Sequence, residues 1–234
     1  MSRWIFVMVT CLNMSWASAP EEATTEIYRP VTQEMLDREA EILRMGFVEP
    51  KPEKSFKIAV QPKTATAIPQ NLYSQAMAYF QANQSKFSNK NYVTVVDFSK
   101  FSGAIRMWVV STKDGSAEEL HVAHGKNSDP TNSGYATKFS NVIGSLQSSL
   151  GAYLTAEQIT DHGTPALVID GLSTTNSNAR QRAVWIHGAT YVYNSDSKPG
   201  RSWGCFAIPL DRVAGVVSKI RGGSLLYVGL SGAK

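Results

Sequence analysis

Six short runs rich in valine, isoleucine and aromatic residues place the strongest constraint on the fold of this chain. Gly, Asp or Ser lies directly beside most of the runs, which is typical of β-strands that alternate with turns. The runs cover residues 92–98, 105–110, 120–123, 166–169, 183–186 and 225–228. Because helical patterns are fewer, we predict a mainly β domain with a few flanking helices.

Three segments show the pattern of helices. Residues 32–45 begin with a capping threonine, carry early acidic residues and are followed by a glycine, and residues 69–87 space apolar side chains at helical intervals. A third predicted helix presents one apolar face, formed by Leu210, Val213, Ala214, Val217 and Ile220.

The first seventeen residues have the layout of a secretory signal peptide. Arg3 precedes an apolar run at residues 4–12, and the small residues Ser15 and Ala17 fit the positions that a signal peptidase recognises. We therefore expect residues 1–17 to be removed and the mature protein to lie in the periplasm or the cell wall.

The rest of the chain is predicted to have two parts. Residues 18–68 are interrupted by prolines and predict an N-terminal extension or linker with one helix, and residues 69–234 predict the main domain. No segment approaches the roughly 20 apolar residues of a membrane helix, so we expect no membrane insertion after cleavage. The net charge of +4 is a mild excess of basic over acidic residues. We expect a monomer with no nucleic-acid partner.

Cys205 is the only cysteine that remains once the signal peptide is removed, because Cys11 lies inside that segment. Such a lone thiol in an exported protein pairs between chains, is buried and inert, or is reactive. Its surroundings favour a reactive thiol. The preceding Gly204 permits a tight turn, so the N–H groups of Gly204 and Cys205 are candidates for an oxyanion hole.

His187 is the candidate base for this thiol. It ends the strand run at 183–186, and the loop at 193–201 between it and Cys205 is long enough to go out and return. The two side chains are therefore expected to meet across adjacent strands, where an imidazole generates the thiolate. The alternative is a histidine that is simply hydrogen-bonded at a strand end.

Several motifs in one order resemble a known family. The segments 186–189 (IHGA) and 200–205 (GRSWGC) resemble the active-site signature of YkuD-type L,D-transpeptidases, which remodel peptidoglycan. Further motifs are similar to the divergent branch called the murein L,D-transpeptidase catalytic domain family; they lie at 124–127 (HGKN), 139–141, 148–151, 170–172 and 178–183. The resemblance spans roughly residues 92–229.

This resemblance implies a fold, a reaction and a partner. The implied fold is a YkuD-like β-sandwich with the cysteine in a cleft. The implied reaction begins when Cys205 attacks a stem-peptide carbonyl and expels D-alanine, and it ends when the acyl group passes to an amine. Peptidoglycan stem peptides are the implied partner, with no metal or cofactor, and carbapenems are the implied inhibitors.

The sequence departs from the commoner YkuD pattern on both sides of the cysteine. The usual histidine two residues before it is replaced by Trp203, which cannot accept a proton, and the usual arginine two residues after it is replaced by Ala207. Arg201 or Arg182 is a candidate to bind the substrate carboxylate in place of that arginine.

Three further residues are candidates for substrate contact. Trp203 is expected to stack on sugar or peptide, although aromatic residues beside strands often belong to the core. Ser202 either orients the substrate or bonds nearby backbone. His124 either lines the cleft or orders a loop through hydrogen bonds.

Other functions stay open on the sequence alone. If water is the acyl acceptor, the protein is an L,D-carboxypeptidase. A peptidoglycan-binding module that has lost catalysis would also tolerate the nonstandard Trp203. A zinc hydrolase using His124, His162 and His187 is the weakest alternative, because their spacing matches no familiar ligand motif.

Overall fold

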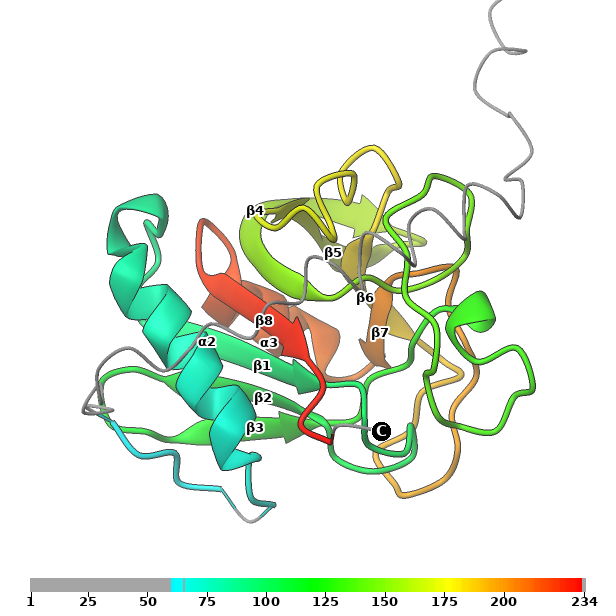
Figure 1. Ribbon diagram of the computed structural model, residues 1–234, viewed down its shortest axis with the longest axis horizontal. Helices are drawn as coiled ribbons and strands as arrows, with labels where there is room; N and C mark the ends of the chain where they lie inside the picture. The colour runs from blue at the N-terminus through cyan, green and yellow to red at the C-terminus, as the bar shows by residue number, and fades with distance from the viewer. Residues whose placement is uncertain (1–59, 65, 233–234) are drawn as a thin grey trace, which may run out of the picture. The chain divides into compact units, whose positions relative to one another are not determined.

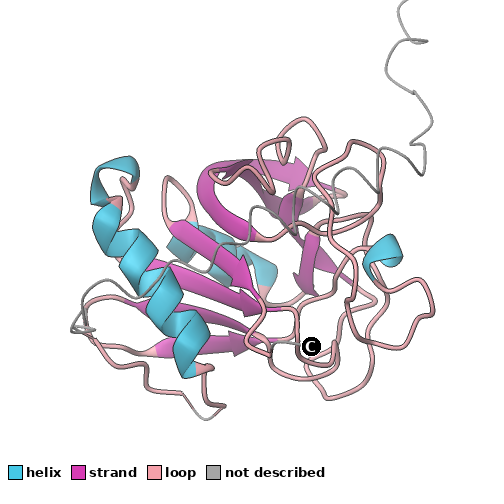
Figure 2. Cartoon of the chain, in the orientation of Figure 1, coloured by secondary structure: helices cyan, strands magenta, loops and turns pink. Residues whose placement is uncertain are grey.

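The computed structural model describes residues 60–64 and 66–232, in which strands dominate (Figures 1 and 2). The helices are α2 (Gln70–Ala82), η2 (Gln84–Lys86), η3 (Lys126–Ser128) and α3 (Val213–Ile220). The strands are β1 (Tyr92–Asp97), β2 (Met107–Ser111), β3 (Ala117–Leu120), β4 (Gly151–Asp161), β5 (Thr164–Gly171), β6 (Trp185–Ala189), β7 (Phe206–Pro209) and β8 (Leu225–Gly229). The predicted mainly β fold with flanking helices is confirmed. The predicted signal peptide and the helix at 32–45 lie outside the described residues.

The strands form one eight-stranded sheet in the order β3-β2-β1-β8-β4-β5-β6-β7. The pairs β1–β8 and β6–β7 are parallel, and the other neighbours are antiparallel. Ala123, three residues after β3, forms an isolated bridge with Ala207 in β7. Through this bridge the two ends of the sheet meet, so the sheet is nearly closed.

Hydrophobic side chains cover both faces of the sheet. Val93 and Val95 of β1 pack with the apolar face of α2, whereas Val96 packs with α3 on the opposite face. In Figure 1, α2 lies across β1. A strand buried on both faces has a continuous apolar sequence. For this reason the run at 92–98 is the clearest strand signal in the chain.

Most predicted elements are present. The helix predicted at 69–87 corresponds to α2 followed by η2, and the six strand runs overlap β1, β2, β3, β5, β6 and β8. The apolar face expected for the last helix is wrong in part. Leu210 precedes α3 and is exposed, Ala214 faces solvent, and Val216 is buried instead. Strands β4 and β7 were not predicted.

The segment at 60–68 lies against the sheet. The indole Nε1 of Trp108 donates a hydrogen bond to the carbonyl of Thr66 at 3.0 Å, and the amide of Thr66 donates to the Glu119 carboxylate at 3.0 and 3.1 Å. Tyr73 Oη also donates to the carbonyl of Val60 at 3.0 Å. Within the described residues, no helix is both long and apolar enough to span a membrane.

Candidate active site

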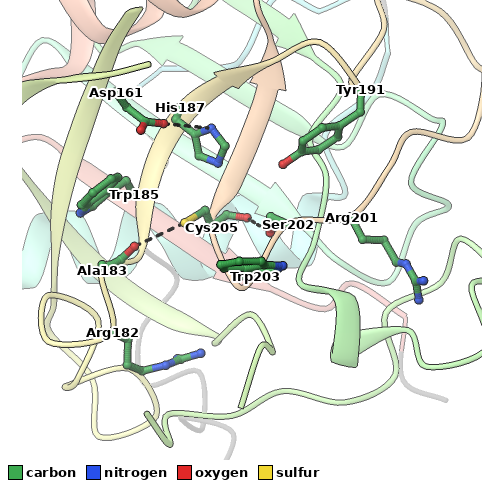
Figure 3. Close-up of a pocket in the computed structure, with 10 residues that line it drawn as sticks. All are labelled: Asp161, Arg182, Ala183, Trp185, His187, Tyr191, Arg201, Ser202, Trp203 and Cys205. Carbon is green, nitrogen blue, oxygen red and sulfur yellow. Dashed lines mark hydrogen bonds and ion pairs between the residues drawn. The ribbon is translucent and has the colours of Figure 1, made fainter. Parts of the chain in front are cut away.

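Two parallel strands bring Cys205 and His187 to one face of the sheet. In the register of β6 and β7, His187 is opposite Ala207. Cys205 immediately precedes β7, and its side chain lines the same pocket as His187. The pairing of β6 and β7 brings the two residues near each other across adjacent strands. Both residues line one pocket (Figure 3).

The pocket has a volume of about 410 Å³ and draws on several loops and strands. Six of the eight site residues expected from the sequence line it; they are Cys205, His187, Arg182, Arg201, Ser202 and Trp203. Four further residues complete the lining; they are Asp161, Ala183, Trp185 and Tyr191. Gly204 and His124 are not part of the lining.

The thiol of Cys205 is hydrogen-bonded, and its pKa is raised. Its Sγ donates a hydrogen bond to the carbonyl of Ala183 at 3.4 Å, and Ala183 holds a left-handed backbone (φ +50°) that is unusual for alanine. Burial raises the pKa of the Cys205 thiol above its ordinary value, and this outweighs the opposing effects of the Trp185 N–H and the Arg182 charge. Nucleophilic attack therefore requires a base.

The ring of His187 has the tautomer that a base needs. Its Nδ1 lies 3.1 Å from the carbonyl oxygen of Gly188, and a carbonyl only accepts hydrogen bonds, so the proton is on Nδ1. The other ring nitrogen, Nε2, is left to accept a proton. In Figure 3 the ring extends into the pocket on the side of Cys205.

Asp161 is a pocket residue that the sequence analysis missed. Its Oδ2 lies 3.9 Å from Nδ1 of His187, and both side chains are largely buried. Asp161 is the last residue of β4, at the tip of the hairpin with β5, and β5 pairs with β6. The residues Asp161-His162-Gly163 are typical of a turn. Because strand β4 was not predicted, the sequence did not indicate that this turn lies beside His187.

The loop before Cys205 is fixed by its own hydrogen bonds. The N–H of Gly204 donates to Ser202 Oγ at 3.1 Å, and this hydroxyl donates to the carbonyl of Cys205 at 2.7 Å. Gly204 has φ +130°, and a Cβ there would lie 2.9 Å from the carbonyl oxygen of Gln147. The Gly204 N–H, expected in an oxyanion hole, is thus engaged within the loop. Ser202 thus hydrogen-bonds nearby backbone, which is one of the two roles predicted for it.

Both candidate arginines are anchored to backbone carbonyls. Arg182 Nη1 donates to the carbonyl of Ser140 at 2.6 Å, and its Nη2 donates to the carbonyl of Gln147. Arg201 Nη1 donates to the carbonyls of Lys126 and Asp129, and Figure 3 shows its guanidinium directed away from Cys205. Trp203 is 77% exposed at the rim of the pocket.

His124 lies below the surface, outside the pocket. Its Nδ1 accepts a hydrogen bond from Arg106 Nη2 at 3.0 Å, and its Nε2 is 3.6 Å from Asp129 Oδ2. Burial, and then the charge of Arg106, lower the pKa of His124 to about 3. The carbonyl of His124 accepts the amide of Ser202 at 3.0 Å. The structure thus favours the loop-ordering interpretation of this residue.

The histidines of the zinc alternative have different environments. His124 is buried, His187 lines the pocket, and the side chain of His162 is 94% exposed. Among residues 60–64 and 66–232, no group of three His, Cys, Asp or Glu side chains is arranged to hold a metal ion.

Cys205 and His187 thus line one pocket of a mainly β domain. The family model described as "L,D-transpeptidase catalytic domain" matches residues 64–228. The chain therefore belongs to this family, as the sequence motifs predicted. No curated protein matches the chain.

Solved structures are similar to parts of the chain. One is the Ldtfm–avibactam carbamoyl enzyme, with 18% identity and a TM-score of 0.39 over 62% of this chain and 50% of that one. Another is an L,D-transpeptidase from Mycobacterium smegmatis, with 12% identity and a TM-score of 0.37 over 59% of this chain and 58% of that one. An L,D-transpeptidase from Xylanimonas cellulosilytica has 11% identity and a TM-score of 0.35 over 85% of this chain and 94% of that one. The chain thus spans about half the length of the first of them.

Proposed function

We propose that the protein is an exported cysteine L,D-transpeptidase that acts on peptidoglycan stem peptides in the periplasm or cell wall. The observation that carries the proposal is the shared pocket of Cys205 and His187 in a chain of the L,D-transpeptidase catalytic domain family. The signal-peptide pattern at residues 1–17 supports export. An intact Met1 on protein isolated from its native envelope would contradict export.

The acylation half of the reaction uses the two residues as one unit. Nε2 of His187 takes the proton of Cys205 Sγ, and the sulfur attacks the carbonyl carbon of the residue before a terminal D-alanine. The carbonyl electron pair moves onto oxygen. When it returns, the carbon–nitrogen bond breaks, and the imidazolium gives its proton to the leaving amine of D-alanine. A thioester on Cys205 and free D-alanine result.

The transfer half reverses these roles. An amine from a second stem loses a proton to His187 and attacks the thioester, and the sulfur leaves and recovers its proton. Asp161, 3.9 Å from Nδ1 of His187, stabilises the imidazolium formed in both halves. The carboxylate also disfavours a nearby thiolate, so the negative charge on sulfur develops together with the positive charge on the ring.

The rim of the pocket supplies contacts for the substrate. The exposed indole of Trp203 offers a flat apolar surface to sugar or peptide. Arg201 and Arg182 each use part of their five N–H donors on backbone carbonyls, so a carboxylate bound there shares the guanidinium with the protein.

The direct test measures release of D-alanine from a disaccharide-tetrapeptide by the wild-type protein and Cys205→Ser. We expect the variant to lose nearly all turnover, because an alcohol has a far higher pKa than a thiol. Mass spectrometry of the products distinguishes a crosslinked dimer from a tripeptide, which would indicate water as the acceptor. A folded Cys205→Ser protein with wild-type turnover would rule out covalent cysteine catalysis.

The carbapenem imipenem provides a second test of the same nucleophile. A sulfur that attacks an amide also opens a strained β-lactam, so one inhibitor mass should be added and located on Cys205. An adduct on any other residue would contradict the assignment.

A further inference from the structure

The hydroxyl of Tyr191 points into the pocket without a partner. Tyr191 follows β6 and lines the pocket with Cys205 and His187. In Figure 3 its ring extends inward, with the oxygen directed toward the space beside these two residues. Among the described residues, no hydrogen bond involves this hydroxyl. A phenol in such a position offers a donor to whatever occupies the pocket.

The ring that carries this hydroxyl is held in place. It packs against a small buried cluster that includes Ala189, Val192 and Ala207. On its other side is Gly200, whose amide donates to the carbonyl of Tyr191 at 2.9 Å. A Cβ at Gly200 would lie 2.9 Å from the Tyr191 ring, so only glycine allows this close approach. The hydroxyl is therefore fixed before substrate arrives, as electrostatic catalysis requires.

Acyl transfer needs a hydrogen-bond donor beside the carbonyl that the sulfur attacks. When the sulfur attacks a carbonyl, negative charge develops on the carbonyl oxygen and must be stabilised. The Gly204 N–H, a donor expected from the sequence, already donates to Ser202 Oγ at 3.1 Å. Tyr191 supplies a hydroxyl that has no such competing partner in the described part of the chain.

We infer that Tyr191 is a catalytic residue whose hydroxyl donates a hydrogen bond to the oxyanion of the tetrahedral intermediate at Cys205. The inference rests on the proposed function. The carbonyl electron pair that moves onto oxygen during attack accepts this hydrogen bond, and the bond weakens when the pair returns and the leaving amine departs. Tyr191 keeps its proton throughout, since His187 carries out the proton transfers.

The environment of Tyr191 keeps it a donor. Burial raises the pKa of Tyr191 to about 12, and the negative charge of Asp161, together with that of Cys205 whenever it is a thiolate, acts in the same direction. The phenol is therefore protonated at neutral and mildly alkaline pH. Its neutral state also avoids repulsion with the developing oxyanion.

The test compares acylation with alkylation of the same sulfur in Tyr191→Phe. Acylation by imipenem, or by a disaccharide-tetrapeptide, passes through an oxyanion. Alkylation by iodoacetamide does not, because a sulfur–carbon bond forms as iodide leaves and no carbonyl is attacked. We expect acylation to slow by about 100- to 1,000-fold, the usual effect of losing one oxyanion donor, with the alkylation rate unchanged. For the tetrapeptide, the loss should appear in kcat and not in KM.

Tyr193→Phe is the matched control, because Tyr193 lies two residues away, is 49% exposed and does not line the pocket. It should acylate at the wild-type rate. Equal acylation rates in Tyr191→Phe and wild type would overturn the inference. An equal loss in the alkylation rate, or a change in KM alone, would also overturn it. If the wild-type thiol is alkylated but accepts neither acyl donor, the proposed function fails and the inference falls with it.

Discussion

Two histidines close in space to the cysteine loop have opposite environments. His187 faces the pocket with 15% of its side chain exposed and keeps Nε2 available, whereas His124 is 1% exposed, and burial and then the charge of Arg106 lower its pKa. A base must exchange protons with substrate, and only the first environment permits this. The second holds the loop that carries Ser202.

We predict that His187→Ala lowers D-alanine release by at least about 100-fold, because the variant lacks both the base and the proton donor to the leaving group. Since the two residues act together, Cys205→Ser with His187→Ala should be scarcely slower than Cys205→Ser alone. Circular dichroism checks that each variant is folded. An unchanged rate in His187→Ala would move the base to another residue.

His124 makes the folded state sensitive to acid. Its pKa is about 3 in the folded protein against an ordinary 6.5, so between these values the unfolded chain binds a proton that the folded chain does not. The free energy of unfolding should therefore fall as pH drops through this window, with a slope of up to about 1.4 kcal/mol per pH unit from this residue. Urea unfolding of His124→Asn should show a shallower decline than wild type. Parallel declines would contradict this role.

At the scale of elements, the hairpin of β4 and β5 places the Asp161 carboxylate beside His187, the proposed base. We predict that Asp161→Asn slows turnover by about 5- to 30-fold, which corresponds to losing about 1–2 kcal/mol of imidazolium stabilisation. The control is Asp211→Asn, which makes the same change at an exposed carboxylate that does not line the pocket, so turnover should be unchanged. Equal turnover in wild type and Asp161→Asn would remove Asp161 from the mechanism.

Sequence patterns predicted the elements that are buried on a regular face and missed those that are not. Strand β4 has the sequence GAYLTAEQITD, and its outer half is largely exposed, so neither alternation nor an apolar run marks it. Strand β7 has only four residues and ends in Pro209. Because Asp161 ends β4, its place beside His187 was beyond sequence reasoning. The Cys205–His187 pair was accessible because both residues border short apolar runs.

At the scale of the whole molecule, residues 60–68 contribute to the main domain. The family match begins at residue 64, and Ile68 is 7% exposed against the sheet cluster that includes α2. The predicted boundary between residues 68 and 69 was based on the prolines. Prolines indicate local backbone conformation and carry no information about contacts with distant residues. Thr66 contacts Trp108 and Glu119, which are far from it in the sequence, so these contacts produce no local sequence pattern.

We predict that a chain starting at Val60 folds and retains alkylation of Cys205, and that a chain starting at Pro69 is less stable. The shorter chain loses the buried Ile68 side chain and the hydrogen bonds of Thr66, which together lower the free energy of unfolding by about 2–4 kcal/mol. Urea titration of both chains measures the difference. Equal midpoints would show that residues 60–68 do not stabilise the domain.

We expect the hydrogen bond from the Cys205 thiol to the carbonyl of Ala183 to slow oxidation of the sulfur as well, because only the protonated thiol donates it. Peroxide attacks a thiolate, and a thiol kept protonated reacts slowly. The described residues contain no other cysteine to convert a sulfenic acid into a disulfide. Within the described part of the chain, oxidised Cys205 would therefore have no partner thiol for repair. In the proposed mechanism the sulfur becomes charged only when His187 takes its proton, so it would seldom expose the thiolate that peroxide consumes.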